Sequence, residues 1–269
     1  MDQRVARFEP RRFRSTVAWY EQFRLPYPDR LVVRVAALAG LKPGDAVLDL
    51  GTGTGMLAVA FARLGMVVTA MDPEPAMLAA AGAAAEAAGV PLVLEQGSSY
   101  DLGPGMGPFR LVTMGRSFHW MDRAATLGVL DRIVAPGGTV ALFHDAHPPV
   151  EENGWFKLLH DVQARFGRFG DQGAKDRRSG GGEHRRYEPY LFASAFSRID
   201  SVSATIRQEI GVDDIVGRAL SMSLCSPERL GPRQDAFIDA LMAALLKLSP
   251  DGRFTEVAEL VAVLACRPQ

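Results

Sequence analysis

The chain has 269 residues, of which 48% are hydrophobic, enough for one α/β domain with a cap or for two small domains. Its formal net charge of −1 does not favour a general polyanion binder, so no nucleic-acid partner is expected. Two widely separated cysteines, the lack of an apolar leader and the lack of a membrane-length apolar run predict a cytoplasmic protein with no membrane partner.

Predicted strands and helices alternate regularly in the first half of the chain, after an arginine- and aromatic-rich arm at residues 1–28. This alternation predicts a mostly parallel sheet with right-handed crossovers. Strands are expected at 46–50, 67–71, 92–95, 109–114 and 139–144, and helices at 30–39, 56–64, 75–88 and 123–133.

The pattern changes after residue 145. An insertion at 146–190 begins with a predicted helix at 151–166 and continues into a segment, 165–186, that holds seven Lys and Arg residues and a Ser-Gly-Gly-Gly run. That composition predicts a mobile loop, and interrupting acids argue against nucleic-acid binding. Residues 191–269 are expected to finish the sheet and to carry a helical cap at 211–250. Strands are predicted at 197–210 and 256–265, and helices at 212–220 and 227–248.

A glycine turn follows the strand at 46–50 and is the most informative stretch of the chain. Gly51, Gly53 and Gly55 alternate there, which brings bare backbone against a ligand at the end of a sheet. The dinucleotide fingerprint would need glycine where Met56 stands, which disfavours an NAD-type oxidoreductase. A P-loop is excluded, since no Gly-Lys-Ser/Thr follows. Asp49, inside the strand, can orient the turn or receive a cation such as an amino-acid ammonium group.

The sequence resembles the class I S-adenosylmethionine-dependent methyltransferases, and most closely their small-molecule branch, often called type 11. The resemblance covers roughly residues 20–145 and implies an α/β, Rossmann-like fold: a seven-stranded, mostly parallel sheet with the last strand antiparallel, plus a helical lid. It implies S-adenosyl-L-methionine as cofactor and S-adenosyl-L-homocysteine as product. The residues that carry it are Asp49 to Gly55, Thr69 to Pro73 with Asp72, Gly115 to Trp120, and Pro136 to Gly138.

The same resemblance implies a set of cofactor contacts. Asp72 would accept the ribose hydroxyls, although a solvated acid or a helix N-cap is the alternative. Arg24 would pair with the cofactor carboxylate, although an arm simply packed on the domain is the alternative. Serines stand where related enzymes often place an acid near adenine. The full set is Tyr20, Arg24, Asp49, Gly51, Thr52, Gly53, Asp72, Pro73, Met77, Ser98, Ser99, Gly115 and Arg116.

Candidates for catalysis follow the fourth and fifth predicted strands, at the edge where ligands bind in open α/β sheets. His119 is the candidate general base, and a structural role in shaping the pocket is its alternative. Trp120, His144 and Asp145 are predicted on the substrate side, with packing as the alternative for Trp120. The spacing of His144 and Asp145 does not match an octahedral oxygen site, so no metal is expected.

These features predict a methyltransferase that acts on a small molecule by in-line transfer to oxygen or nitrogen, with bacterial secondary metabolism as a setting. Two rivals keep the cofactor: a different reaction that uses the sulfonium charge, and a non-catalytic partner subunit. The substrate and the oligomeric state are left open by the sequence.

Overall fold

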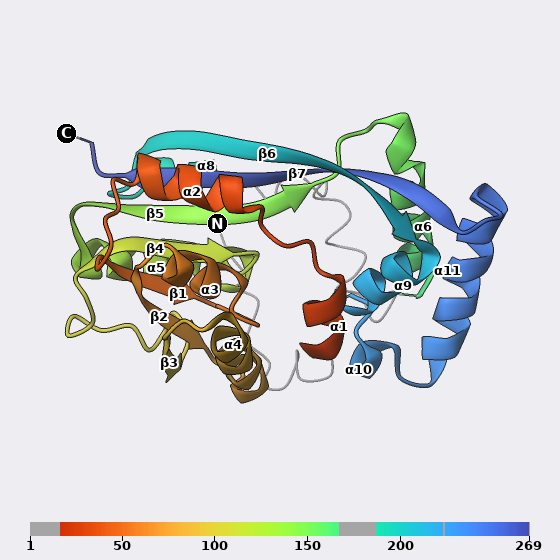
Figure 1. The fold of residues 1–269 in the computed structure, drawn as a ribbon, viewed down its shortest axis with the longest axis horizontal. Helices are drawn as coiled ribbons and strands as arrows, with labels where there is room; N and C mark the ends of the chain where they lie inside the picture. Colours follow the sequence, from red (N-terminus) through yellow and green to blue (C-terminus); the bar gives the residue numbers. More distant parts are fainter. Residues whose placement is uncertain (1–16, 167–186, 223, 269) are drawn as a thin grey trace.

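The computed structural model describes residues 17–166, 187–222 and 224–268. Within them, seven strands form one sheet in the order β3-β2-β1-β4-β5-β7-β6 (Figure 1). The strands are β1 (Ala46–Leu50), β2 (Val67–Asp72), β3 (Val93–Gln96), β4 (Phe109–Gly115), β5 (Val134–Ala146), β6 (Arg198–Gly211) and β7 (Arg253–Cys266).

The direction of the strands confirms the predicted fold class. Strands β1 to β5 pair with one another in parallel, in the order β3-β2-β1-β4-β5. The last strand, β7, is inserted between β5 and β6 and runs antiparallel to both. The central strand β1 is buried along nearly its whole length, as expected for a parallel strand covered on both faces. The glycine turn therefore leaves the sheet at its centre, between β2 and β4.

Helices cover both faces of the sheet. On one face, α2 (Asp29–Leu38) and α3 (Met56–Arg63) bury apolar side chains against the strands, with Phe61 and Phe143 at the centre of that core. The other face is covered by α5 (Arg123–Ile133) and the short α8 (Glu188–Phe192). Helix α4 (Pro75–Ala88) connects β2 to β3 in the chain and packs beside α3.

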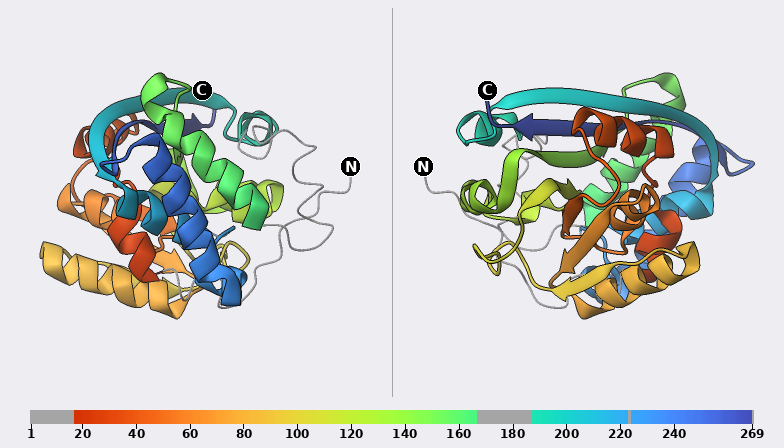
Figure 2. Two further views of the ribbon diagram at one scale, coloured as in Figure 1. Left: turned by 90° about the vertical axis from the view of Figure 1, so that its right-hand side faces the viewer. Right: turned by 60° about the vertical axis from the view of Figure 1, so that its left-hand side comes forward.

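A third core lies in the cap at the end of the two long strands β6 and β7 (Figures 1 and 2). It is built around Trp155 and Phe237, both fully buried. The cap helices are α6 (Gly154–Phe166), α9 (Val212–Leu220), α10 (Pro227–Leu230) and α11 (Gln234–Leu248). The N-terminal helix α1 (Val17–Phe23) packs against α9, so the predicted arm joins the cap.

The cap departs from the sequence prediction in one element. The single helix predicted at 227–248 is broken into α10, a short 3₁₀ turn at 231–233, and α11. Gly231 has a φ of 52°, and Pro232 cannot donate a backbone hydrogen bond, so the helix cannot continue through them. The predicted mobile loop at 165–186 lies outside the described residues from 167 onward. The domain boundaries drawn from the sequence stay predictions.

Candidate functional site

The glycine turn after β1 is held by close contact with the loop that follows β4. Gly51 has a φ of 71°, and a Cβ there would stand 2.6 Å from the Cβ of Ser117. The Ser117 hydroxyl donates to the carbonyl oxygen of Leu50 at 2.8 Å. Gly53 has a φ of 56°, and a Cβ there would lie 4.0 Å from the ring of Tyr20. Glycine is therefore required at position 51 for both conformation and space.

Asp49 lies at the end of β1 with its side chain buried under this turn. Its carboxylate accepts hydrogen bonds from the hydroxyls of Thr52, at 2.6 Å, and Thr113, at 2.7 Å. Burial raises the pKa of Asp49, and the two hydroxyl donors oppose that rise. The structure thus gives Asp49 the loop-orienting role that the sequence suggested, while the residue also lines the cleft described below.

Asp72 ends β2 and faces the same turn. Its two carboxylate oxygens accept from the backbone N–H of Gly53, at 2.9 Å, and of Glu74, at 3.0 Å. Burial raises the pKa of Asp72 to about 6. Pro73 is half-buried, and Met77, in the first turn of α4, is buried. The true N-cap of α4 is Glu74, whose side chain accepts from the N–H of Ala76, so the capping alternative for Asp72 is not what this helix uses.

The loop after β3 contains an acid that the sequence reasoning passed over. The backbone N–H and the hydroxyl of Ser98 both donate to Asp101, each at 2.8 Å. These bonds lower the pKa of Asp101, which is exposed. Ser99 is buried beside them. The Ser-x-x-Asp spacing, which suits a side-chain-closed turn, was the available signal.

Two arginines from distant parts of the chain meet at the ends of β4 and β5. Arg116 donates through Nε to Asp145 and through Nη2 to the carbonyl oxygen of Leu25, at 2.9 Å. Its guanidinium lies 4.6 Å from the centre of the Tyr27 ring. Arg116 has a φ of 55°, the one positive φ at a non-glycine residue within the described ranges. Such backbone is held only where the surroundings fix it, and it occurs often at functional sites.

Asp145 is therefore an ionic partner of Arg116. Burial acts to raise the pKa of Asp145, but the charges of Arg116 and Arg24 outweigh burial and lower that pKa. Burial acts to lower the pKa of Arg116, and the charge of Asp145 outweighs it and raises that pKa. Both groups stay charged at neutral pH, and Asp145 orients Arg116, while its predicted contact with the substrate stays a prediction.

The arm brings a second guanidinium to this place. Arg24 follows α1, lies 5.0 Å over the ring of Tyr20, and donates through Nη2 to the carbonyl oxygen of Ser221 at 3.2 Å. Among the described residues, three buried donors around it lack a hydrogen-bond partner: Arg24 Nε, Arg116 Nη1 and the hydroxyl of Tyr27. Asp145 pairs with Arg116 alone, so the buried Arg24 guanidinium, whose pKa is lowered by burial, has no carboxylate of its own. The arrangement suits an additional anion, because unpaired buried donors are costly.

A cleft that is open to solvent lies beside the glycine turn, and Tyr20, Tyr27 and Asp49 are among its lining residues. The two guanidiniums lie behind its tyrosines, Arg24 on the ring of Tyr20 and Arg116 on the ring of Tyr27. The site therefore combines the Asp49 carboxylate with unpaired donors behind one wall. An amino acid's ammonium and carboxylate need that combination, so the residues fit the methionine half of S-adenosylmethionine. The cleft is lined by Tyr20, Tyr27, Asp49, Gly51, Thr52, Met56, Leu57 and Gly115.

The predicted catalytic and substrate residues lie beyond the end of β4 and at the end of β5. His119 and Trp120 form a half-buried 3₁₀ turn, with their ring centres 4.7 Å apart. His144 packs edge-on against Tyr187, at 5.9 Å between ring centres. Tyr187 also packs on Phe118. The structure thus brings His119, Trp120 and His144 to the sheet edge that carries the cleft, without fixing a chemical role for any of them.

The described residues show neither a cluster of metal ligands nor a helix suited to cross a membrane. Nowhere in 17–166, 187–222 and 224–268 do three or more His, Cys, Asp or Glu side chains gather as metal ligands. None of the helices described by the structure combines the length and the apolar character needed to span a bilayer.

Part of the chain matches known methyltransferases. Residues 47–138 match a family model described as a methyltransferase domain. An uncharacterised methyltransferase of Mycobacterium bovis is 31% identical over 157 residues, which cover 58% of this chain and 60% of the relative. Demethylmenaquinone methyltransferase of Thermus thermophilus is 35% identical over 132 residues, 48% of this chain and 59% of the relative. The chain thus matches about 60% of the length of these curated relatives.

Solved structures agree on the fold. The YcgJ protein of Bacillus subtilis aligns over 90% of this chain and all of its own, with a TM-score of 0.52 at 16% identity. A protein of Anaeromyxobacter dehalogenans, provisionally assigned as a Type II methyltransferase, aligns over 91% of this chain and 98% of its own, with a TM-score of 0.55 at 20% identity. The glycine turn, Asp49 in β1 and Asp72 at the end of β2 all lie within residues 47–138, the part that matches the family model. This part of the chain therefore forms a class I S-adenosylmethionine-dependent methyltransferase domain, with S-adenosylmethionine as its cofactor.

Proposed function

We propose that the protein methylates a small molecule, at oxygen or nitrogen, with S-adenosylmethionine as the donor. The observation that carries this proposal is the cleft lined by Asp49 and the glycine turn, with Asp72 holding that turn from the end of β2 and the unpaired Nε of Arg24 behind Tyr20. The bound cofactor supplies a methyl group that is already electrophilic. The protein's own task is then to orient a nucleophile toward it and to exclude water.

Each part of the cofactor has a proposed place. Asp72 would accept the ribose hydroxyls, since its oxygens retain acceptor capacity beside their two backbone bonds. Arg24 would hold the carboxylate, and Asp49 would face the ammonium group. The loop of Ser98 and Ser99 would receive the adenine, with Asp101 as the acid of that loop. The other proposed contacts are Tyr20, Gly51, Thr52, Gly53, Pro73, Met77, Gly115 and Arg116.

The substrate side is proposed beyond β4 and β5. His119 is the candidate base for a hydroxyl nucleophile, whose proton must be removed; an amine need only arrive neutral. Trp120 and His144 would contact the substrate, beneath a lid made by the arm and the cap. A cytoplasmic location and a role in bacterial secondary metabolism stay predictions, and demethylmenaquinone methylation by the Thermus relative is one instance of small-molecule chemistry in a similar chain.

Calorimetry tests the cofactor half first. S-adenosylmethionine and S-adenosylhomocysteine should bind in the micromolar range, NAD should not, and Asp72→Ala should weaken both sulfur ligands by roughly ten-fold or more, the loss expected for hydrogen bonds to a charged group. A preference for NAD would contradict the proposal.

Product analysis over a panel of hydroxyl and amine acceptors tests the second half. Methylated product with His119→Gln slowed only for hydroxyl acceptors would support the base. Tight cofactor binding with another product, or with none over a wide panel, would favour the two rivals.

A further inference from the structure

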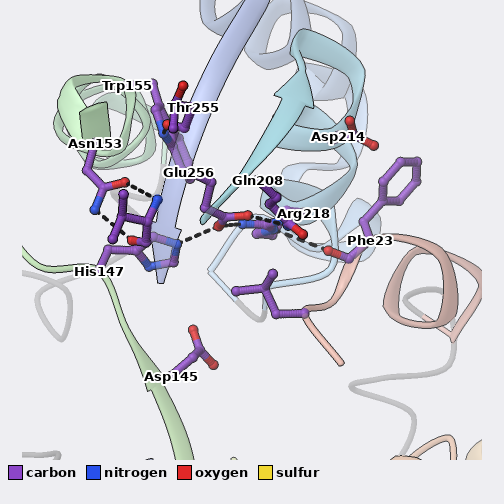
Figure 3. A network of polar contacts seen from close by, with 12 residues as sticks. Phe23, Asp145, His147, Asn153, Trp155, Gln208, Asp214, Arg218, Thr255 and Glu256 are labelled. Atoms are coloured by element: carbon purple, nitrogen blue, oxygen red, sulfur yellow. Dashed lines mark hydrogen bonds and ion pairs between the residues drawn. The ribbon is translucent and has the colours of Figure 1, made fainter. Parts of the chain in front are cut away.

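A buried ionic network lies between the cap and the sheet, outside the cleft (Figure 3). Its centre is Glu256 of β7, whose side chain is 0% exposed. One carboxylate oxygen of Glu256 contacts His147 Nε2 at 2.6 Å and also accepts from Arg218 Nη1, and the other accepts from Gln208 at 2.8 Å. None of these four residues was predicted to belong to the functional site, and they come from different elements of the fold.

The network keeps Glu256 ionised despite its burial. Burial acts to raise the pKa of Glu256, but the hydrogen bonds from His147 and Arg218 outweigh it, and the pKa is lowered. Arg218 is itself 5% exposed. A buried ion pair of this kind is weak evidence for stability, because apolar replacements of similar volume are often as stable. The network is therefore better explained by a role in positioning a neighbouring segment of the chain than by stabilisation of the fold.

Arg218 extends from this network to the arm. Its Nε donates to the carbonyl oxygen of Phe23, at 3.2 Å, and Phe23 is the residue directly before Arg24. Figure 3 shows Arg218 between Glu256 and Phe23. Beside it, Gly217 makes room for the Phe23 ring, since a Cβ there would be 2.3 Å from that ring. The same stretch of chain ends in Ser221, whose carbonyl oxygen accepts from Arg24 itself.

We infer that Glu256 and Arg218 are positioning residues for cofactor binding. Glu256 fixes the Arg218 guanidinium, Arg218 fixes the Phe23 carbonyl, and the arm thereby presents the unpaired Nε of Arg24 to the carboxylate of the ligand. This inference rests on the proposed pairing of Arg24 with that carboxylate. Arg24 lies on the ring of Tyr20, which lines the cleft, whereas neither Glu256 nor Arg218 lines the cleft or contacts that ring.

The test compares two ligands that differ in the carboxylate. S-adenosylhomocysteine carries the amino-acid group, and 5′-methylthioadenosine has the same adenosine and thioether without it. The double variant Arg218→Met/Glu256→Gln removes both buried charges together, which avoids stranding either of them. By calorimetry it should bind S-adenosylhomocysteine roughly ten-fold more weakly, the loss of one charge-assisted hydrogen bond, and 5′-methylthioadenosine unchanged. Arg253→Met, at the exposed pair with Glu209 on the same two strands, β6 and β7, is the control and should alter neither affinity.

Three outcomes have defined meanings. Equal losses for both ligands would show a general structural role and overturn the inference. A further loss when the double variant is added to Arg24→Met would also overturn it, because residues acting through Arg24 should add nothing once Arg24 is gone. If Arg24→Met weakens the two ligands equally, or wild-type protein binds neither, the proposed function fails at Arg24 or at the cofactor.

Discussion

At the scale of single residues, the site depends on a few atoms with little freedom. Asp72 spends both carboxylate oxygens on the backbone N–H groups of Gly53 and Glu74, so the second strand's acid also fixes the glycine turn. The glycine turn also packs against Ser117 so closely that no Cβ fits at Gly51. Ligand recognition and loop geometry are therefore served by the same groups, and each can be tested by a change of one or two atoms.

The raised pKa of Asp72 predicts a pH dependence of cofactor binding. Its carboxyl has a pKa of about 6 in the protein, so it is ionised at pH 8 and mostly protonated at pH 5. An ionised carboxylate accepts the ribose hydroxyls, and a protonated one loses acceptor capacity, so affinity should fall as pH drops through 6. Calorimetry with S-adenosylhomocysteine should show a loss of about ten-fold between pH 8 and pH 5.

Asp72→Asn is the control for that measurement, because the amide has the same shape and does not titrate. Its affinity should be lower and flat over the same range. Histidines also titrate there. If the variant keeps the wild-type slope, a group other than Asp72 is responsible and the assignment is wrong.

Substitution of Gly51 tests the contact between the two loops. Gly51 and Gly89 both have positive φ, at 71° and 66°, so alanine costs about 1 kcal/mol of backbone strain at either position. At Gly51 alone the new Cβ would meet Ser117, at 2.6 Å, whereas nothing lies within 4 Å at Gly89. Gly51→Ala should lose about 1–3 kcal/mol more in urea unfolding than Gly89→Ala, from overpacking. Equal losses would mean that the close approach is absent in solution.

At the scale of elements, the arm helix α1 belongs with the cap helix α9. The Phe23 ring occupies the space above Gly217, and Trp19 stacks on Phe23 with 5.6 Å between ring centres. This docking sets the direction in which the chain leaves α1 toward Arg24. The arm is thus an outer wall of the cleft held by residues far along the chain, and a glycine in the middle of a helix has a packing reason there.

Gly217→Ala is predicted to disturb this docking. Alanine in a helix interior gains about 0.5–1 kcal/mol over glycine, as expected for Gly128→Ala in α5, where nothing lies within 4 Å. At Gly217 a Cβ would stand 2.3 Å from the Phe23 ring, which outweighs that gain. Gly128→Ala should raise thermal stability slightly and keep S-adenosylhomocysteine affinity. Gly217→Ala should lower both, and an affinity equal to wild type would contradict the role given to the arm.

The elements also show how far the sequence reached. Strands β1 to β4 were predicted closely because buried apolar runs and glycine turns are local signals, and Asp49 and Asp72 follow from their place at the ends of two such strands. Strand β5 begins at Val134, well before the predicted start at residue 139, because it continues through the Pro-Gly-Gly segment that was expected to be a turn. The pairing of Arg116 with Asp145 was missed because it depends on which way side chains point from adjacent strand ends. The Glu256 network was missed because its members lie up to 109 residues apart and no local pattern links them.

At the scale of the whole molecule, the sheet and the cap are joined through the long strands β6 and β7, which run from one to the other (Figure 2). The cleft opens where the arm meets the turn after β1 and the end of β4, and the arm is in turn hydrogen-bonded to the cap helix α9 and to Ser221 after it. Binding in such a cleft should tie together segments that are distant in sequence, because the unpaired donors near it come from the arm and from the end of β4.

Hydrogen exchange measured by mass spectrometry can detect that coupling. Saturation with S-adenosylhomocysteine should slow exchange both in α1, residues 17–23, and in α9, residues 212–220, because Arg24 contacts Ser221 and Arg218 contacts Phe23. Helix α5, on the far face of the sheet, should change little. Protection limited to the glycine turn would show that ligand binding is not coupled to the arm or to the cap.

The position of β7 has a consequence for synthesis on the ribosome. β7 is the last strand of the sheet to be translated, yet within the described residues it is the sole hydrogen-bonding neighbour of β6. The 14 residues of β6 therefore have no partner until residues 253–266 have emerged, and Glu256 emerges with them. The parallel strands can assemble earlier, but the anchor of the arm cannot. Nascent chains halted before residue 253 should be cut by protease within 198–211, and chains halted well beyond 266 should resist.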